Sequence, residues 1–361
     1  MTRFHRRTGR PALSTAETRA LSARRLAPQP VGMEDLILAA AEFRGGYAFR
    51  SDLLDAGLRD RHIRAAMREG FLERLRHGTY APRTVTGPLS PEQRHKLIAY
   101  SIADKLGPAV TLSHHSAAIA HGCPTWGIDL GVFHLTRVDG RSGRLDASVR
   151  YHVGAVVPSD DLTICDGRQV VKPARAVVES CSLSSVEAGM ITASFALRNQ
   201  AVSLPELDEL MERHARWPGM LHVRVAVSAA EPRCESVGEV RSMHMFRVAG
   251  IPRPEPQFVV TRGDSFVART DFGWEEFRHV GEFDGEVKYG RLNPNGGGEL
   301  GQVIVEEKRR EDAVRELEYG MSRWGWRDLA PSVREGTAHR IRVAMEQSRR
   351  LHRRDTRTPL G

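Results

Sequence analysis

The sequence predicts an α/β protein that is divided into several domains. Residues 33–86 contain three short segments of helical periodicity followed by a basic hairpin, and residues 231–329 alternate helix-like and strand-like segments. The chain has 361 residues, of which 40% are hydrophobic. Because a domain usually contains roughly 100–200 residues, this length accommodates two or three domains with ordinary hydrophobic cores.

Changes in charge and in hydrophobic pattern divide the chain into five segments. These segments are a basic arm (1–32), a winged helix-turn-helix domain (33–87), a mixed α/β middle domain (88–230), a second α/β domain (231–329) and a basic C-terminal tail (330–361). The arm contains seven arginines and one acidic residue, and its prolines prevent a long helix. Two interpretations of the arm remain open, contact with DNA phosphates and a solvated tail.

The charge of the chain favours a polyanionic partner. The formal net charge is +8 and the isoelectric point is about 9.7, which is typical of nucleic-acid-binding proteins; the alternative is a basic protein without such a partner. The four cysteines form no Cys-x-x-Cys pair, which argues against a zinc or disulfide framework. Residues 1–32 lack the apolar core of a secretory signal, and no run approaches the ~20 apolar residues of a membrane span. We therefore expect a cytoplasmic protein without a membrane partner.

The N-terminal domain is predicted from its periodicity and its glycines. Apolar residues recur at helical spacing over 33–43, where two glycines follow, and a second short helix is expected over 51–56. A third helix is expected over 61–69, with Asp60 as its N-cap. Its expected core-facing residues are Ile63, Ala66 and Met67. Residues 71–81 then form a hairpin with a basic tip, which completes a winged helix-turn-helix.

The third helix is the candidate DNA-reading element. Arg61, Arg64 and Arg68 fall at i, i+3 and i+7 and therefore share one exposed face. We expect this helix to enter the major groove while the hairpin meets phosphate. The complete set of candidate DNA-binding residues is Arg59, Arg61, Arg64, Arg68, Arg74 and Arg76. The alternative is a winged helix that contacts a protein.

The middle domain reads as mixed helix and strand. Helices are expected over 91–106, 111–121, 173–181, 186–199 and 204–215, and strands over 131–137, 149–152 and 162–165. The second of these helices would carry His114, His115 and His121. Their spacing lacks the i, i+4 pair of a helical zinc site, so hydrogen bonding or packing is the preferred interpretation.

The N-terminal domain also resembles a known family. The resemblance rests on Gly46-Tyr47, Asp55-Ala56-Gly57-Leu58, Arg68-Glu69-Gly70-Phe71-Leu72-Glu73-Arg74-Leu75 and Gly78-Thr79-Tyr80-Ala81. These residues are similar to the N-terminal domain of AbiEi-type antitoxins, the transcriptional regulators of type IV toxin–antitoxin pairs, and residues 88–230 are similar to their central region. The resemblance implies DNA and a cognate toxin protein as partners.

A cluster of charged residues stands out near the C-terminus. Glu282 and Asp284 would project from the same side of an extended strand, and Asp271 lies upstream. Carboxylates on one face repel each other unless a cation lies between them, and oxygen ligands suit Mg²⁺ or Mn²⁺. Lys288 could stabilise charge on a phosphate. The alternative is a hairpin turn at Asp284-Gly285 with a solvated strand face.

The order of elements around this cluster resembles the PD-(D/E)xK nuclease fold, in the branch of very-short-patch-repair endonucleases. We expect a helix over 235–249, strands over 257–261, 266–272 and 279–283, a helix over 303–319 and a strand over 324–326. The matching residues are Glu239, Pro256-Gln257, Asp271, Glu282-Phe283-Asp284-Gly285, Glu311-Asp312 and Arg315. Asp284 stands where the lysine of this pattern usually does, and Glu286-Val287-Lys288 supplies a lysine further on.

Two functions follow from these observations. The first is a DNA-binding transcriptional regulator or antitoxin whose last domain is structural or vestigial. The second is a metal-dependent endonuclease targeted by the winged helix, in which Asp271, Glu282 and Asp284 hold Mg²⁺ or Mn²⁺. In that enzyme the resemblance implies that Glu239 assists from the helix and that Lys288 stabilises the transition state. Convergence of Asp271 and Glu282 would favour the enzyme.

Overall fold

The computed structural model describes residues 32–141, 145–146, 148–285 and 308–352. The chain forms two compact units, residues 1–89 and 90–361, of mixed α and β structure. Within the described part of the chain, each helix is either too short or too polar to cross a membrane.

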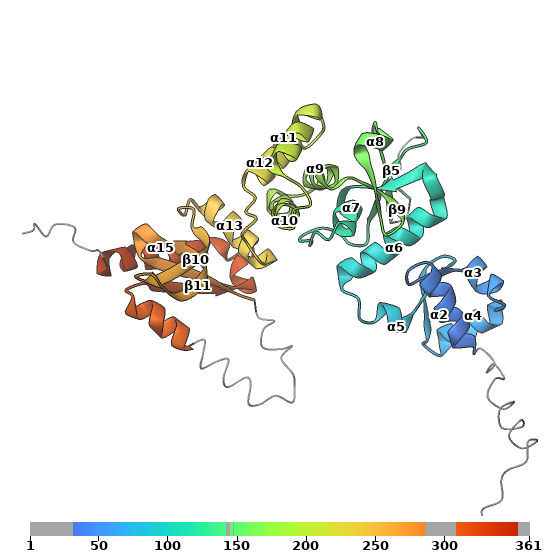
Figure 1. Ribbon diagram of the computed structural model, residues 1–361, viewed down its shortest axis with the longest axis horizontal. Coiled ribbons are helices and arrows are strands. Elements are labelled where there is room, and N and C mark those ends of the chain that lie inside the picture. The colour runs from blue at the N-terminus through green and yellow to red at the C-terminus, as the bar shows by residue number, and fades with distance from the viewer. Residues whose placement is uncertain (1–31, 142–144, 147, 286–307, 353–361) are drawn as a thin grey trace, which may run out of the picture. The chain divides into compact units, whose positions relative to one another are not determined.

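The first unit contains short helices and a small antiparallel sheet (Figure 1). Its elements are α2 (Met33–Phe43), β1 (Ala48–Phe49), α3 (Arg50–Asp55), α4 (Asp60–Arg68), β2 (Leu72–Arg76), β3 (Thr79–Pro82) and α5 (Arg83–Thr86). The sheet has the strand order β1-β3-β2. The helices bury one face each, because Ile37, Leu53 and Ile63 form a common core with Leu72.

The structure changes two details of the expected third helix. Helix α4 begins at Asp60 rather than after it, and the N-cap position belongs to Arg59, whose backbone N–H is bonded to the His62 ring. Ile63 and Ala66 are buried as expected, whereas Met67 is 36% exposed. A helix of this length turns only a narrow stripe toward the core, and Met67 lies at its edge.

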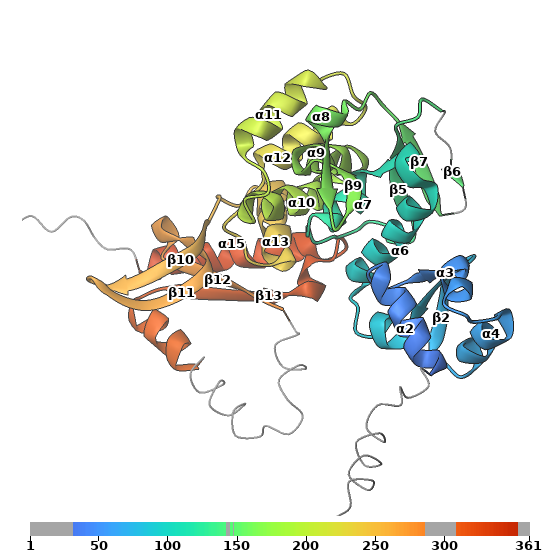
Figure 2. The same cartoon turned by 45° about the vertical axis from the view of Figure 1, so that its right-hand side comes forward.

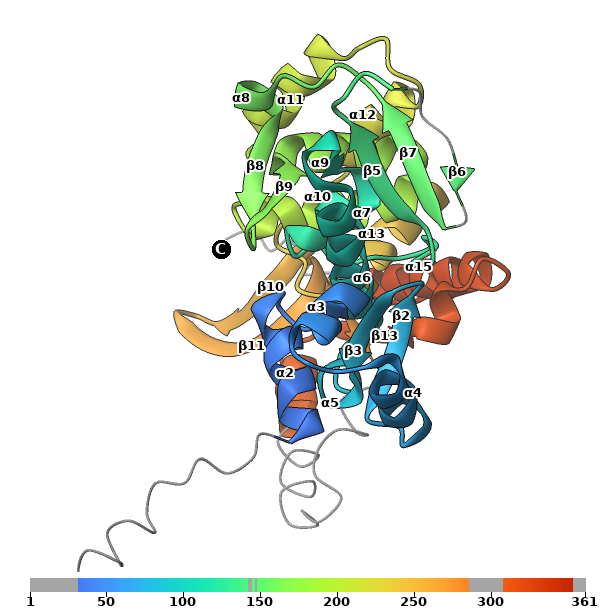
Figure 3. The same cartoon turned by 90° about the vertical axis from the view of Figure 1, so that its right-hand side faces the viewer.

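The middle region places helices against a six-stranded mixed sheet, several strands of which lie side by side in Figure 3. The strands are β4 (Val110–Leu112), β5 (Phe133–Arg137), β6 (Leu145–Asp146), β7 (Val149–Val153), β8 (Leu162–Cys165) and β9 (Arg168–Val171), in the order β6-β7-β5-β4-β9-β8. The helices are α6 (Pro91–Leu106), α7 (His114–Ala120), α8 (Pro158–Asp161), α9 (Pro173–Leu183), α10 (Val186–Arg198), α11 (Leu204–Arg213) and α12 (Met220–Ser228).

The segment expected as one helix over 111–121 is a strand followed by a helix. Strand β4 ends at Leu112, Ser113 is extended, and α7 begins at His114, whose φ is +49°. The three β4 residues are buried, because they pair with β5 on one side and β9 on the other. Three buried residues are too few to show a strand period in the sequence.

The C-terminal region contains a four-stranded sheet flanked by helices (Figure 2). Its elements are α13 (Val237–Ala249), β10 (Glu255–Arg262), β11 (Ser265–Trp274), β12 (His279–Asp284), a helical segment at 308–316, β13 (Gly320–Gly325) and α15 (Arg334–Leu351). The strand order is β10-β11-β12-β13, with β12 and β13 parallel and the other pairs antiparallel. This order reproduces the expected succession of helix, three strands, helix and strand.

Helix α15 occupies much of the segment expected as a basic tail. Its described contacts include both α13 and β13. Ala338, Ile341 and Met345 are each 1% exposed, and they follow the i, i+3, i+7 spacing of one helix face. The C-terminal region therefore extends to Leu351. The arginines and other charged residues of α15 lie on the solvent-facing side of this helix.

The middle and C-terminal regions share one apolar cluster. This cluster extends from Ala118 on α7 to Met345 on α15 and includes Phe246 of α13. The Phe246 ring makes edge-to-face contacts with Phe272, Trp274 and Trp324, with centroids 5.2, 5.2 and 5.5 Å away. Residues 90–361 accordingly form one compact unit. The predicted domain boundary between residues 230 and 231 lies inside this unit.

Replacing two helical glycines by alanine should change the free energy of unfolding in opposite directions. An added Cβ at Gly238 of α13 would lie 2.0 Å from Phe283 Cε1, whereas one at Gly336 of α15 would meet nothing within 4 Å. We expect Gly238→Ala to lower the free energy of unfolding by about 1–3 kcal/mol through overpacking. Gly336→Ala should raise it by up to about 1 kcal/mol, because alanine has the higher helix propensity. Urea denaturation checks both values; a stable Gly238→Ala protein would show that α13 does not pack closely on β12.

Candidate functional site

The arginines of α4 form an exposed basic face. Arg61, Arg64 and Arg68 are all exposed, and so is the N-cap residue Arg59. None of the first three forms an ion pair with any residue that the structure describes. Nε of Arg61 instead lies 3.1 Å from Nε2 of the neighbouring His62 ring. The guanidinium groups on this face are therefore available to an anionic ligand.

The acidic residue at the start of α4 is already neutralised. Asp60 and Arg50 form a bidentate ion pair with N–O distances of 2.6 and 2.8 Å. The hydrogen bond from Arg50 is the main reason that the pKa of Asp60 lies below its ordinary value. Arg50 is therefore the main partner of this carboxylate, and its interaction with Arg64 of α4 is a smaller contribution.

The hairpin beside α4 adds two more arginines. Helix α4 packs against β2, which carries Arg74 and Arg76. Arg74 is exposed, whereas Arg76 is partly buried and has a partner within the protein. Gly78, with φ at +72°, forms the turn to β3, a conformation that suits glycine. The six predicted DNA-binding residues thus belong to α4, its N-cap and the adjoining hairpin.

Glu239 has a structural role at the start of α13. Its side chain is 5% exposed and accepts hydrogen bonds from the Ser236 hydroxyl at 2.7 Å and the Glu235 backbone N–H at 2.8 Å. The Gln257 amide donates a third bond at 2.9 Å. The carboxylate therefore caps the first turn of α13 and fixes it to β10.

Asp271 lies where β11 and β12 separate. The paired register ends at Phe272 opposite Gly281. Beyond this point the Asp271 carboxylate accepts the Phe283 backbone N–H at 2.8 Å. Asp271 thus bonds to the backbone of the strand that carries Glu282 and Asp284.

Glu282 is surrounded by arginines. Arg323 of β13 lies 2.9 Å from one carboxylate oxygen, and Arg310 lies 3.4 Å from the other. Arg323 also approaches Glu311 at 3.5 Å. A guanidinium group therefore supplies at Glu282 the positive charge that a divalent metal would otherwise bring.

The predicted metal ligands do not converge as a group of three. Asp284 is exposed at the end of β12, and Lys288 lies outside the described residues. Within the described ranges, Asp271, Glu282 and Asp284 do not bring three ligand atoms within 4.8 Å of one another. The arginine partners of Glu282 could not be identified from the sequence, because Arg323 reaches it only through the parallel pairing of β12 with β13.

A buried thiol lies close to two of these carboxylates. Burial, followed by the negative charges of Glu239, Glu231 and Asp271, raises the pKa of the Cys234 thiol. Gln257, which bonds to Glu239, has an uncommon positive φ of +54°. Such backbone strain in a residue other than glycine is concentrated at functional sites. Neither feature could be identified from the sequence alone.

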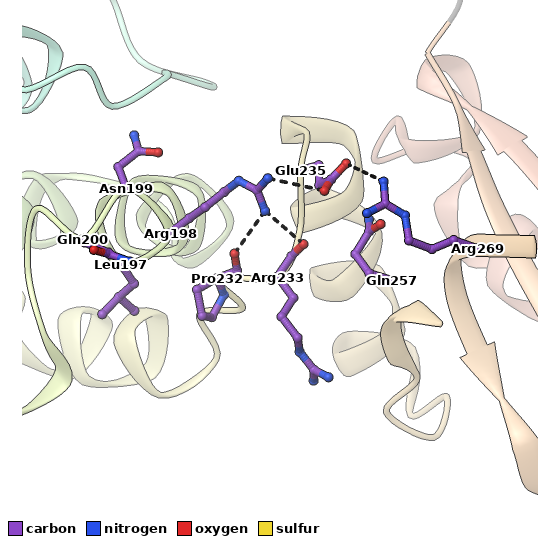
Figure 4. A pocket seen from close by; sticks show the side chains of 9 residues that line it. All are labelled: Leu197, Arg198, Asn199, Gln200, Pro232, Arg233, Glu235, Gln257 and Arg269. Carbon is purple, nitrogen blue, oxygen red and sulfur yellow. Dashed lines mark hydrogen bonds and ion pairs between the residues drawn. The ribbon is translucent and has the colours of Figure 1, made fainter. Parts of the chain in front are cut away.

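A pocket of about 520 Å³ opens beside Gln257 (Figure 4). Figure 4 shows Arg198 and Arg269 reaching Glu235 from opposite sides, at 3.4 and 3.3 Å. Arg198 also donates to the carbonyl oxygens of Pro232 and Arg233. Arg198 and Arg269 share Glu235, and Arg233 pairs with Glu231, so each arginine that lines the pocket has a carboxylate partner, unlike the arginines of α4.

The histidines form a different cluster from the one considered in the sequence. His114, His134 and His152 each place one ring nitrogen within 4.8 Å of the others. His121 instead bonds the Val171 carbonyl. The sequence does not indicate this group, because two of its members lie on strands that are distant in sequence from α7.

Comparisons with known proteins leave the family open. No protein-family model matches the chain, and no curated protein matches it significantly. Among solved structures, the RV2827C protein from Mycobacterium tuberculosis is similar over 66% of this chain and 91% of that chain, with 15% sequence identity and a TM-score of 0.35.

Proposed function

We propose that this protein is a DNA-binding transcriptional regulator of the antitoxin type, in which residues 33–87 form a winged helix. The observation that carries the proposal is the face of Arg61, Arg64 and Arg68, which is exposed and has no ion-pair partner among the described residues. Phosphate attraction dominates protein–DNA affinity, so an unpaired arginine face beside a basic hairpin suits DNA.

Duplex DNA binding tests this proposal directly. Fluorescence anisotropy with a random-sequence duplex, repeated over a series of salt concentrations, gives the association constant at each concentration. We expect log K to fall linearly with log salt, with a slope of about −0.9 for each phosphate contacted. Binding that is undetectable at low salt, or that does not change with salt, would contradict the proposal.

The resemblance to AbiEi-type antitoxins extends the proposal to a partner. We propose that a cognate toxin protein is produced together with this regulator. Co-expression with the product of an adjacent gene, followed by a growth assay, tests this part separately from DNA binding. DNA binding without relief of growth arrest would leave a regulator that is not an antitoxin.

The second candidate is a divalent-metal endonuclease of the PD-(D/E)xK type. The succession of α13, three strands, a helical segment and β13 supports it, as does the bond from Asp271 to the Glu282-bearing strand. The pairing of Glu282 with Arg323 and Arg310 weighs against it, because a bound metal would have to displace these cations. We therefore place the regulator first.

Plasmid cleavage separates the two candidates. We expect supercoiled DNA to remain intact in Mg²⁺ or Mn²⁺, since arginines neutralise Glu282. Nicking or linearisation by the parent protein would establish the endonuclease instead. In that case Glu282→Gln should abolish cleavage and leave duplex affinity unchanged, because DNA affinity is assigned to residues 33–87. A contaminating nuclease would still cleave in the Glu282→Gln preparation.

A further inference from the structure

Three histidines from separate elements lie together in the middle region. His114 begins α7, His134 lies on β5 and His152 lies on β7. Nδ1 of His134 and Nε2 of His152 are 2.9 Å apart, and the His114 ring stacks on the His152 ring at 3.6 Å between centroids. Imidazole nitrogens are preferred ligands of zinc and related divalent transition metals.

The short contact between two of these rings suits a metal, because neutral imidazole is the form that coordinates one. The two nitrogens that lie 2.9 Å apart share a single proton, and a metal ion can take the place of that proton.

A buried ion network next to His114 contains an excess of acidic groups. Arg175 lies 2.7 Å from Asp161 and 2.7 Å from Glu179, and all three residues are at most 5% exposed. One guanidinium thus faces two carboxylates. Glu179 also lies 3.4 Å from His114 Nδ1. A cation held by the histidines would balance the second carboxylate, and burial of uncompensated charge is costly.

The same contacts orient His114 as a ligand. Its Nδ1 lies 3.0 Å from the Ser113 hydroxyl as well as near Glu179, which leaves Nε2 for coordination. Metal-binding histidines usually make such a bond from their second nitrogen to a carboxylate or another polar group. Thr136 stands opposite His152 in the pairing of β5 with β7, and its buried hydroxyl has no partner among the described residues.

We propose that His114, His134 and His152 bind one divalent transition-metal ion of the zinc class. Binding requires a small rearrangement, because two nitrogens on a tetrahedral zinc ion lie about 3.3 Å apart when each bond is about 2.0–2.1 Å. The His134–His152 separation must widen accordingly, and one of the two stacked rings must rotate toward the ion. A water molecule in the fourth position would give Thr136 a hydrogen-bond partner.

Cobalt binding by the full chain tests the site. Protein treated with EDTA and dialysed should bind Co²⁺ in a one-to-one ratio and develop the visible absorption of tetrahedral cobalt with nitrogen ligands. Zn²⁺ should displace the cobalt and remove the absorption, whereas Mg²⁺ should not. A parent protein that develops no such absorption, and whose calorimetric titration with Zn²⁺ shows no binding, would overturn the proposal without recourse to any variant.

Substitutions identify the ligands. His134→Gln and His152→Gln should each weaken Co²⁺ binding by at least about a hundredfold, and Ser113→Ala, which acts through His114, by about tenfold. The matched control is His115→Gln, since His115 is also buried and contacts the His134 ring edge-to-face at 5.1 Å but is not one of the three. Equal losses in His115→Gln and His134→Gln, with all proteins folded by circular dichroism, would overturn the assignment.

Discussion

Replacing Arg61, Arg64 and Arg68 together by alanine should weaken duplex DNA binding by roughly a hundredfold. An exposed charge pair contributes up to about 1 kcal/mol, and three such pairs correspond to roughly two orders of magnitude in affinity. The slope of log K against log salt should also become shallower by about three units, because each arginine removed leaves one phosphate without its cation. The fold should survive, because all three side chains are exposed.

A matched control separates a specific face from the overall charge. Arg213, Arg216 and Arg224 are also exposed, and they lie in the other compact unit. Replacing these three by alanine removes the same charge and should change affinity by much less. Salt titrations of both triple variants decide the matter. Equal losses would mean that net charge, rather than the face of α4, governs binding.

Replacing Arg175 by leucine should lower the free energy of unfolding by about 3–5 kcal/mol. This substitution leaves Asp161 and Glu179 buried without their shared cation, and an unpaired buried charge carries a cost of that size. The control is Arg213→Leu, because Arg213 pairs with Glu209 at the surface, where a pair contributes less than about 1 kcal/mol. Urea denaturation at pH 7 measures both. Similar values for the two variants would contradict the account of the buried network.

The pH dependence of the Arg175→Leu variant provides a second check. Burial already raises the pKa of Glu179 in the parent protein, and removal of the arginine should raise it further, because the neutral form is favoured once the neighbouring positive charge is lost. A group of this kind stabilises the folded state increasingly as the pH falls toward its unfolded pKa. The stability difference between parent and variant should therefore shrink between pH 7 and pH 5. A constant difference would show that the carboxylates are not the source of the instability.

The sequence predicts elements well where helix ends are marked locally. The helix predicted over 91–106 is found with those bounds as α6, because Ser90 accepts the Gln93 N–H, Pro91 occupies the first turn and Gly107 follows the last residue. The helices predicted over 33–43 and 204–215 likewise agree with α2 and α11 to within two residues at each end. In these segments apolar periodicity and capping residues agree.

The many charged residues of α15 make this helix hard to predict from the sequence. The segment expected as a basic tail contains α15, whose core-facing residues are small or widely spaced among arginines. The mean hydropathy of α15 is low, and its apolar face becomes evident only from its packing against α13 and β13. Strand β4 escapes prediction for the opposite reason, since its three residues are buried on both sides and carry no alternation.

The candidate sites differ in whether their residues lie within one element or come from segments that are distant in sequence. The arginine face of α4 depends on spacing within one helix and could be predicted from residues 61–68. The neutralisation of Glu282 by Arg323, and the meeting of His114 with His134 and His152, depend on strand pairing between segments that are distant in sequence. Periodicity gives the direction of a side chain within an element but does not identify its neighbour on another strand.

The shared apolar cluster has a consequence for ligands. Ala118 lies on the same helix as His114, and Met345 lies on the last helix of the C-terminal region, yet both belong to one cluster. Folding of the two regions is therefore thermodynamically linked. A ligand that binds either region in its folded form adds RT ln(1 + [L]/Kd) to the free energy of any unfolding that disrupts both regions together, so occupancy at one end also stabilises the other against global unfolding.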